Sequence, residues 1–217
     1  MPPSTIPMNN TLHTRVKAAG IAVHHACEVG VYLPHTSNIL GFIDDGLRAT
    51  LVEADPVTVA ELHTYFAQQP QVRIIGKAVY HRRCDLEFCK AEASTFVKEI
   101  SASPALVNDR FDVHDAQTFT VQADTFDTMD DGTIDVLSID TEGCEWYVLQ
   151  FMTSRPAVIS IETGIKRYVN PHLREINAWM HAHGYVRWYR DGSDTVYVRT
   201  DAYSPGFAER IMAWVRR

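Results

Sequence analysis

Acidic residues close most of the apolar runs that the sequence predicts as buried strands. Four of the five runs end on a carboxylate, and the exception is the run that ends at Ala78 and Val79. The acidic ends are Glu28, Glu53 with Asp55, Asp140 with Glu142, and Glu162. In a mostly parallel sheet these ends meet at one edge, where like charges cost free energy unless a ligand compensates them. The pattern therefore predicts a crevice for a ligand that donates hydrogen bonds or carries positive charge.

Glu53 and the turn at Gly30 narrow the class of ligand. An acid at the end of the second strand can accept hydrogen bonds from both hydroxyls of a ribose. A dinucleotide would also need several glycines in the first turn, so that its phosphates can approach the backbone. The turn from Glu28 to Pro34 holds Gly30 alone, and the carboxylate of Glu28 suits an ammonium or a sulfonium. S-Adenosylmethionine meets this description and NAD does not. The structural alternative is that Gly30 only allows a tight turn and Glu28 is solvated.

Alternating apolar runs and helical patterns must position these acids. Strands are expected at residues 22–30, 48–55, 72–80, 133–140 and 156–162. Helices are expected at residues 36–45, 57–68, 145–152, 172–183 and 207–215. Asp55 and Pro56 form the start signal of the second helix, and Gly184 is expected to end the fourth. Residues 185–200 predict a hairpin around Asp191-Gly192-Ser193.

A doubly wound α/β fold follows from this order, with a mostly parallel, Rossmann-like sheet and one antiparallel hairpin at its edge. Residues 1–20 are expected to be a flexible lead-in or a short helix, and residues 21–217 a single domain. Extended pieces at 84–97 and 119–126 flank a less regular stretch at 100–115. His24 and His25 are expected to be hydrogen-bonded strand residues rather than catalytic bases.

Composition predicts a cytoplasmic protein with a small-molecule partner. The 217-residue chain has a formal net charge of −7, and its 20 Lys and Arg residues are scattered. A nucleic-acid partner is not expected, because phosphate binding depends on clustered positive charge. No membrane partner is expected either, since no run of about 18 apolar residues is present and the start MPPSTIPMNN lacks the pattern of a secretory signal. The four cysteines include no CxxC pair, so free thiols are expected rather than disulfides or zinc ligands.

The chain resembles the FkbM-type S-adenosylmethionine-dependent methyltransferases from about residue 22 to residue 200. That family has a D-V-G-A-N-x-G turn, a V-E-P strand end, an I-D-x-E-G-x-E segment, an acid that ends the next strand, and a later Gly-Tyr. The corresponding stretches here are EVGVYLP at 28–34, VEADP at 52–56, IDTEGCE at 139–145, IE at 161–162 and GY at 184–185. The IDTEGCE match is the most specific. Glu28, Tyr32 and Pro34 depart from the family turn, and Pro34 brings a fixed φ and no amide hydrogen.

The resemblance implies a class I methyltransferase fold and a set of site residues. The cofactor S-adenosylmethionine would contact Glu28, Gly30, Val31, Tyr32, Ser37, Glu53, Ala54, Ala78 and Asp140. Asp140, Glu142 and Glu162 would be the catalytic residues. Ser94, Thr95 and Glu145 would bind the acceptor, and residues 81–125 would be a variable substrate region. No metal site is expected as the main interpretation; the lesser alternative is a divalent cation held by Asp140 and Glu162.

Several functions remain open on the sequence alone. The leading one is O-methylation of a small-molecule hydroxyl, on a sugar or a secondary metabolite. N-methylation on the same fold is an alternative. A non-catalytic methyltransferase-like binding module is another, which Pro34 favours, and a dehydrogenase is the last. Residues 80–125 carry no readable motif, so the sequence predicts neither the identity of the acceptor nor the oligomeric state.

Overall fold

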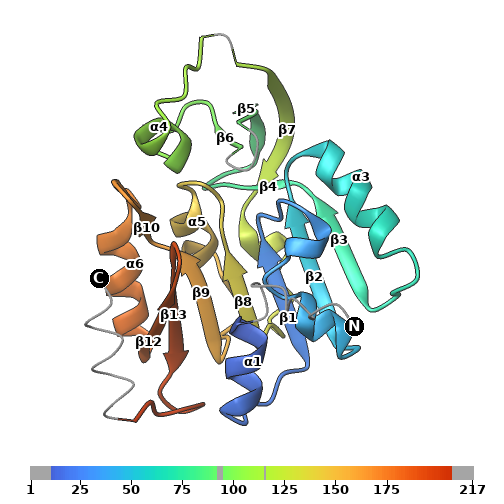
Figure 1. Cartoon of the computed structure of the whole chain (residues 1–217), viewed down its shortest axis with the longest axis vertical. Helices are drawn as coiled ribbons and strands as arrows, with labels where there is room; N and C mark the ends of the chain where they lie inside the picture. The colour runs from blue at the N-terminus through green and yellow to red at the C-terminus, as the bar shows by residue number, and fades with distance from the viewer. Residues whose placement is uncertain (1–10, 92–94, 115, 207–217) are drawn as a thin grey trace, which may run out of the picture.

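The computed structural model describes residues 11–91, 95–114 and 116–206 and has a seven-stranded sheet at its centre (Figure 1). The strand order is β12-β13-β9-β8-β1-β2-β3. These strands are β1 His25–Val29, β2 Arg48–Glu53, β3 Val72–Gly76, β8 Val136–Ile139, β9 Val158–Glu162, β12 Tyr185–Asp191 and β13 Asp194–Arg199. β1 pairs in parallel with β2 and β8, β2 with β3, and β8 with β9. The carboxyl ends of these strands therefore share one edge, and the chain order reverses at β1.

A hairpin of β12 and β13 completes the sheet at one side. β13 pairs antiparallel with both β9 and β12. The turn between Asp191 and Asp194 contains Gly192 at a φ of +58°, in the left-handed region that glycine adopts easily. The expected antiparallel hairpin at the edge is confirmed. β12 is the edge strand, and the antiparallel strand β13 lies one position inside it.

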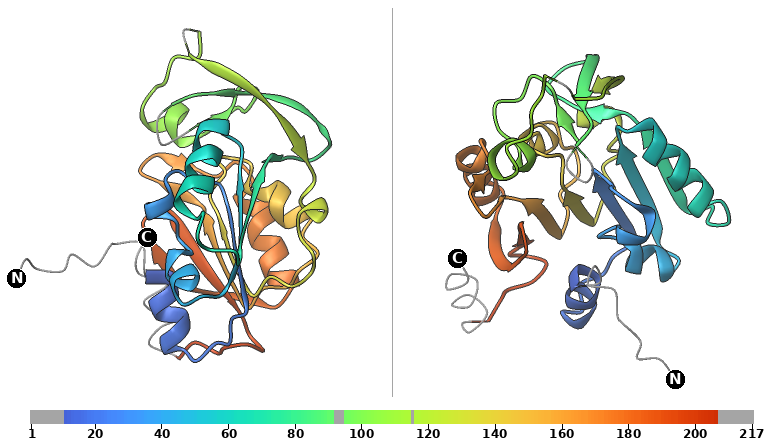
Figure 2. Two further views of the ribbon diagram at one scale, coloured as in Figure 1. Left: turned by 90° about the vertical axis from the view of Figure 1, so that its right-hand side faces the viewer. Right: turned by 45° about the horizontal axis from the view of Figure 1, so that its top comes forward.

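Helices cover both faces of the sheet (Figure 2). The helices on one face are α1 Thr11–Ala18, α2 Leu40–Asp44 and α3 Pro56–Tyr65. Those on the other face are α5 Glu145–Gln150 and α6 Leu173–Ala182. Ala26 and Cys27, neighbours on β1, belong to different core clusters, because successive side chains of a strand point to opposite faces. This is the doubly wound arrangement that the sequence predicts.

A second sheet forms a cap above the carboxyl ends of the central strands (Figure 1). Its strands, in spatial order, are β4 Ala78–Val79, β7 Thr118–Asp124, β5 Cys84–Cys89 and β6 Phe96–Val97. Helix α4, Pro104–Asn108, accompanies this sheet. The described parts of residues 81–125, the stretch expected to be the substrate region, lie largely in this cap. A small hairpin, β10 Gly164–Ile165 and β11 Tyr168–Val169, follows β9.

Two elements near the cap differ from expectation. Residues 72–80 were expected as one strand, but β3 pairs with β2 in the main sheet whereas β4 pairs with β7 in the cap. The apolar pattern runs through both strands, so it does not show that the chain changes sheets at Lys77. The stretch 100–115, expected to be irregular, contains α4. Ser103 caps this helix by accepting a hydrogen bond from the amide of Leu106 (3.3 Å), and Ser103-Pro104 was a readable start signal.

The segment after β1 also differs. A 3₁₀ turn at Pro34–Thr36 and the short helix α2 replace the single helix expected at 36–45. Pro34 begins the turn, at a position where a missing amide hydrogen costs little. The interruption falls at Ser37 and Asn38, because both donate hydrogen bonds to the carboxylate of Glu28.

Other local predictions are confirmed. Asp55 caps α3 by accepting a hydrogen bond from the amide of Val57 (2.8 Å). The ring of His25 bonds Thr50 and Thr133, each at 2.9 Å, as a structural residue. The four cysteines are free.

Among residues 11–91, 95–114 and 116–206, no helix has the length and apolar character of a membrane span. The helix expected at 207–215 lies outside the described residues.

Gly30 brings the ends of β1 and β8 together at the centre of the sheet. Its φ of +86° lies in the left-handed region, and its amide donates to the carbonyl of Val52 (2.9 Å). A Cβ added to Gly30 would lie 1.7 Å from the carbonyl oxygen of Asp140. The position therefore requires glycine on two grounds, the backbone conformation and the lack of space.

Replacing Gly30 by alanine should lower the free energy of unfolding by more than about 2 kcal/mol, because left-handed strain and steric overlap add. Gly46→Ala is the matched control: Gly46 has a φ of +80° and nothing within 4 Å of an added Cβ. The control should lose about 1–2 kcal/mol from the conformation alone. Chemical denaturation measures both variants, and equal losses would contradict the close contact with Asp140.

Candidate active site

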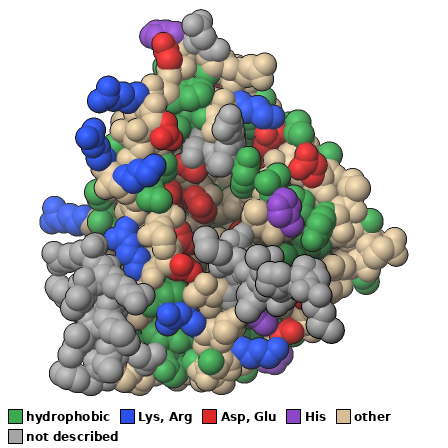
Figure 3. All heavy atoms as spheres, in the orientation of Figure 1, with side chains coloured by type: hydrophobic (Ala, Val, Ile, Leu, Met, Phe, Trp, Pro, Cys, Tyr) green, Lys and Arg blue, Asp and Glu red, His purple; other side chains and the backbone are tan. Residues whose placement is uncertain are grey.

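A cavity of about 310 Å³ lies between the carboxyl ends of the central strands and the cap. Figure 3 shows acidic side chains in the hollow on this face. The expected site residues that line the cavity are Gly30, Val31, Tyr32, Glu53, Ala54, Ala78, Thr95, Asp140 and Glu142. They come from the ends of three central strands, β1, β2 and β8, and from the cap. Ser94, the remaining acceptor residue expected from the cap, lies outside the described residues.

Glu53 is held in a fixed orientation at the end of β2. One carboxylate oxygen accepts a hydrogen bond from the amide of Val31 (2.7 Å), and the other accepts from the amide of Asp55 (2.6 Å). Each oxygen keeps a lone pair that a ligand hydroxyl could use. Burial raises the pKa of Glu53 to about 7 despite these two bonds. The Glu53 carboxylate thus connects the loop after β1 to the end of β2.

Glu28 and Ser37, both expected at the cofactor, are buried next to the cavity and are not part of its lining. The hydroxyl of Ser37 and the amide of Asn38 donate to the Glu28 carboxylate. Burial raises the pKa of Glu28 to about 7. In this structure Glu28 stabilises the loop that contains the lining residues. It would therefore affect a ligand by positioning that loop and not by direct contact.

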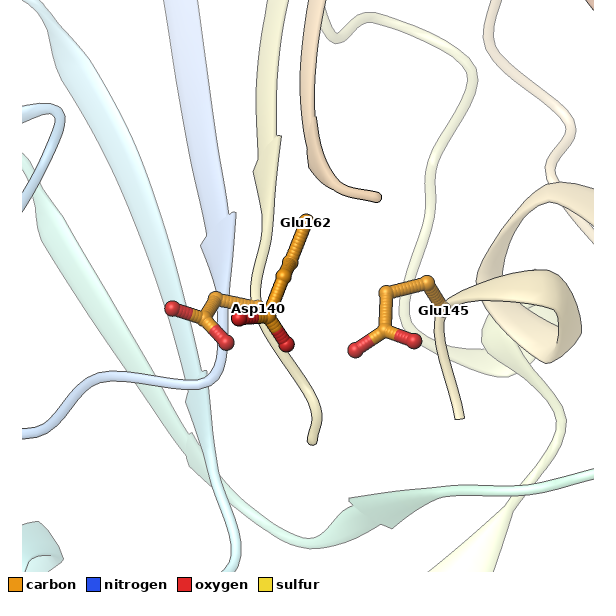
Figure 4. Close-up of side chains that lie close together, drawn as sticks. All are labelled: Asp140, Glu145 and Glu162. Atoms are coloured by element: carbon orange, nitrogen blue, oxygen red, sulfur yellow. The ribbon is translucent and has the colours of Figure 1, made fainter. Parts of the chain in front are cut away.

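Three carboxylates converge where β8, α5 and β9 meet (Figure 4). One oxygen from each of Asp140, Glu145 and Glu162 lies within 4.8 Å of the others. Asp140 Oδ1 and Glu162 Oε2 are buried and, among the described residues, have no hydrogen-bond partner. Burial first, and then the neighbouring carboxylates, raise the pKa of Asp140 and of Glu162. We call these three residues the acidic cluster.

Glu145, expected to bind the acceptor, accepts hydrogen bonds that hold its own loop. Its side chain is fully buried. Oε1 accepts from the amides of Thr141 (2.9 Å) and Gly143 (3.0 Å), and Oε2 accepts from the side chain of Asn170. The loop it holds includes Glu142, which lines the cavity with a φ of +56°. Such a conformation costs a non-glycine residue about 1–3 kcal/mol and is common at functional sites.

The hairpin β10–β11 contributes residues that sequence reasoning missed. Asn170, just after the hairpin, bonds both Glu145 and the carbonyl of Glu162 (3.2 Å). Tyr168 has 1% of its surface exposed, and its hydroxyl has no hydrogen-bond partner among the described residues. Burial, and then the charges of Glu145 and Glu162, raise the pKa of Tyr168. The Asn-Pro pair at 170–171 was a turn signal, but nothing local indicated that Tyr168 faces the acids.

Two lysines on the opposite side of the cavity were also missed. Lys77 lies 3.4 Å from Asp124 of β7, and Lys90 lies 3.2 Å from Asp55. Both lysines line the cavity. The second ion pair links the cap to the N-terminus of α3, across the wall that contains Ala54. These are contacts between distant segments, so no spacing in the sequence could have indicated them.

The chain matches a known family over most of its length. Residues 28–187 match the family described as the methyltransferase FkbM domain. A comparison with curated protein sequences finds no significant match.

One solved structure shares the fold, and others are similar at lower scores. A candidate caffeoyl-CoA O-methyltransferase from Staphylococcus aureus matches with a TM-score of 0.53 and 12% identity, over 88% of this chain and 82% of that one. An O-methyltransferase from Bacillus cereus in complex with SAH has a TM-score of 0.47 and 11% identity, over 89% and 81%. A SAM-dependent methyltransferase from Aquifex aeolicus has a TM-score of 0.44 and 10% identity, over 87% of each chain.

The family match agrees with the geometry at the positions that the sequence singled out. The strand end with Glu53 and the loop after β8 lie on one cavity, and the matched residues 28–187 include both. The dehydrogenase interpretation is thereby ruled out. Pro34, which favoured a non-catalytic module, is buried at the start of a 3₁₀ turn and is not part of the cavity lining. The chain belongs to the FkbM methyltransferase family, whose cofactor is S-adenosylmethionine, and it is a methyltransferase.

Proposed function

We propose that this methyltransferase acts on a hydroxyl group of a small molecule, with the acceptor between the acidic cluster and the cap. The observation that carries the proposal is the pair of buried carboxylate oxygens, on Asp140 and Glu162, that have no partner among the described residues. A hydroxyl can donate a hydrogen bond to such an oxygen. The same oxygen can then accept the proton that the hydroxyl loses during methylation.

The cavity residues fit S-adenosylmethionine. Glu53 would accept the ribose hydroxyls with the lone pairs that the amides leave free. Gly30, Val31 and Tyr32 would lie along the methionine part, and Ala78 beside the adenine. When bound, the cofactor supplies a methyl group on a positively charged sulfur. Positive charge near Asp140 would favour the ionised form of that carboxylate.

Removing the proton of the acceptor would fall to Glu142 or Glu162. A carboxylate whose pKa is raised by burial is a stronger base than an exposed one once it is ionised. Burial raises the pKa of Glu162, and the positive charge of the bound cofactor would favour its ionised form. Glu142 lines the cavity directly, on the loop that Glu145 holds. Phe88, Thr95 and Val97 of the cap line the same cavity and would exclude water from it.

An amine acceptor is the second candidate, because none of the ion pairs among the described residues involves Asp140, Glu145 or Glu162. An ammonium group could supply the missing positive charge. A screen of hydroxyl and amine compounds with labelled S-adenosylmethionine distinguishes the two acceptors. Label that enters only amines would contradict the hydroxyl proposal.

The first test is cofactor binding by the Glu53→Gln variant. The loss of charge-assisted hydrogen bonds should weaken binding of S-adenosylhomocysteine by about 1.5–3 kcal/mol. Calorimetry measures the dissociation constant, and Glu99→Gln, an exposed glutamate of the cap, is the control that should bind as the parent protein does. An unchanged constant for Glu53→Gln would refute the ribose role, and absence of heat for the parent protein would refute the proposed function.

Cofactor binding should also depend on pH. Burial raises the pKa of Glu53 to about 7, so this carboxyl is protonated at lower pH and ionised at higher pH. Since the ionised form accepts the ribose hydroxyls better, affinity should fall by up to about tenfold for each pH unit below 7. The difference between the pH dependence of the dissociation constant in the parent protein and that in Glu53→Gln gives the contribution of Glu53, because both proteins share the other titrating groups. Parallel pH profiles for the two proteins would argue against it.

With an acceptor from the screen, Asp140→Asn should reduce turnover by about a hundredfold or more. Its unfolding temperature should stay the same or rise, because one of several crowded buried carboxylates becomes neutral. Initial rates and thermal unfolding are measured on the same preparation. A large fall in unfolding temperature with turnover retained would instead show that Asp140 is structural.

A further inference from the structure

The acidic cluster lacks a counter-charge. The ion pairs in the described part of the chain satisfy other acids, including Asp45, Asp131 and Asp201 at the surface. No Lys, Arg or His in that part lies within 4.0 Å of Asp140, Glu145 or Glu162. Buried carboxylates that are not paired with positive charge are costly. A bound cation would make the ionised form of this arrangement favourable.

One carboxylate oxygen from each of the three side chains lies within 4.8 Å of the others (Figure 4). Glu145 is fixed by two backbone amides and by Asn170. Asp140 follows β8 directly, and Glu162 is the last residue of β9, so both sit on neighbouring strands that pair in register. Binding would thus require little rearrangement, and pre-organisation of this kind favours affinity.

An independent observation comes from Tyr168. Its side chain is almost fully buried, and its hydroxyl has no partner among the described residues although it lies close to the acidic cluster. Asn108 of α4 holds this position by accepting hydrogen bonds from the amides of Arg167 (3.0 Å) and Tyr168 (3.1 Å). The hydroxyl is therefore a buried oxygen, within electrostatic reach of the acidic cluster, that no described residue uses.

We propose that Asp140, Glu145 and Glu162 form a binding site for a divalent cation such as Mg²⁺ or Ca²⁺, with the hydroxyl of Tyr168 beside it. The donor set consists of oxygens alone, which suits these hard cations rather than zinc or copper. Three carboxylates also provide the charge that a divalent ion balances in a buried site.

The role of the cation rests on the proposed function. Asp140 lines the cofactor cavity, whereas Glu145 and Glu162 are not part of its lining. A cation between them would face the acceptor and bind its oxygen, which lowers the pKa of the hydroxyl. The proton of the acceptor would then pass to Glu142, on the cavity side.

The test is titration of the chelator-treated protein with MnCl₂, MgCl₂ and CaCl₂ in a calorimeter. The parent protein should bind at least one of these ions at a single site. Glu162→Gln should weaken that binding by at least about tenfold. Glu175→Gln, the same substitution at an exposed position of α6, should bind as the parent protein does. Absence of binding in the parent protein, or equal binding by Glu162→Gln and the parent protein, would overturn the proposal.

Terbium luminescence gives a second measurement that does not depend on the folding of Glu162→Gln. Excited tyrosine transfers energy to Tb³⁺ over short distances, so the parent protein should show sensitised emission that excess CaCl₂ removes. Tyr168→Phe should reduce this emission. Emission that Tyr168→Phe leaves unchanged would place the ion elsewhere and overturn the site.

Calorimetry with S-adenosylhomocysteine in the presence of a chelator separates the two proposals. Retained binding of this ligand, together with no binding of any divalent ion, would overturn the cation site and leave the proposed function standing. Absence of ligand binding by the parent protein both with the chelator and with added divalent ions would refute the proposed function.

Discussion

Burial of carboxylates along one edge of a parallel sheet is the constraint on which this site depends. A buried carboxylate needs hydrogen bonds or opposite charge to be tolerated. Glu28 and Glu53 obtain them from a neighbouring hydroxyl and from backbone amides, and in doing so they shape the loops around the cavity. Asp140 and Glu162 each keep an oxygen that nothing in the described chain satisfies. The edge thus contains acids that stabilise loops and acids that remain for ligands.

The cofactor and the acceptor would lie on different sides of this sheet edge. On one side, Gly30 lets the loop after β1 touch the backbone of Asp140, and Glu53 lines the cavity at the end of β2. On the other side, the loop held by Glu145 presents Glu142 in a strained conformation below the cap. Lys90 ties the cap to the start of α3. Cofactor and acceptor would therefore meet between a rigid sheet edge and a separate, smaller sheet.

Much of this arrangement was predictable because it depends on local patterns. Apolar runs that end on acids indicated the strands, and Asp55-Pro56 indicated a helix start, which the structure confirms. The acids at the ends of those strands identified the cavity edge. The parts that differ involve long-range contacts. The chain changes sheets at Lys77 inside a continuous apolar run, and the expected helix at 36–45 is interrupted because Glu28, nine or ten residues earlier, accepts hydrogen bonds from Ser37 and Asn38.

The sequence by itself determined the order of strands and helices, the doubly wound class and the acidic character of one sheet edge, because side-chain periodicity and capping residues act over a few neighbouring positions. Only the tertiary structure decided which acids stabilise loops and which keep an oxygen without a partner. Glu145 and Glu162 are both buried acids at predicted element ends, yet Glu145 holds a loop whereas Glu162 keeps an oxygen without a partner. That difference arises from donors such as Asn170, which reach these acids only after distant segments have packed together.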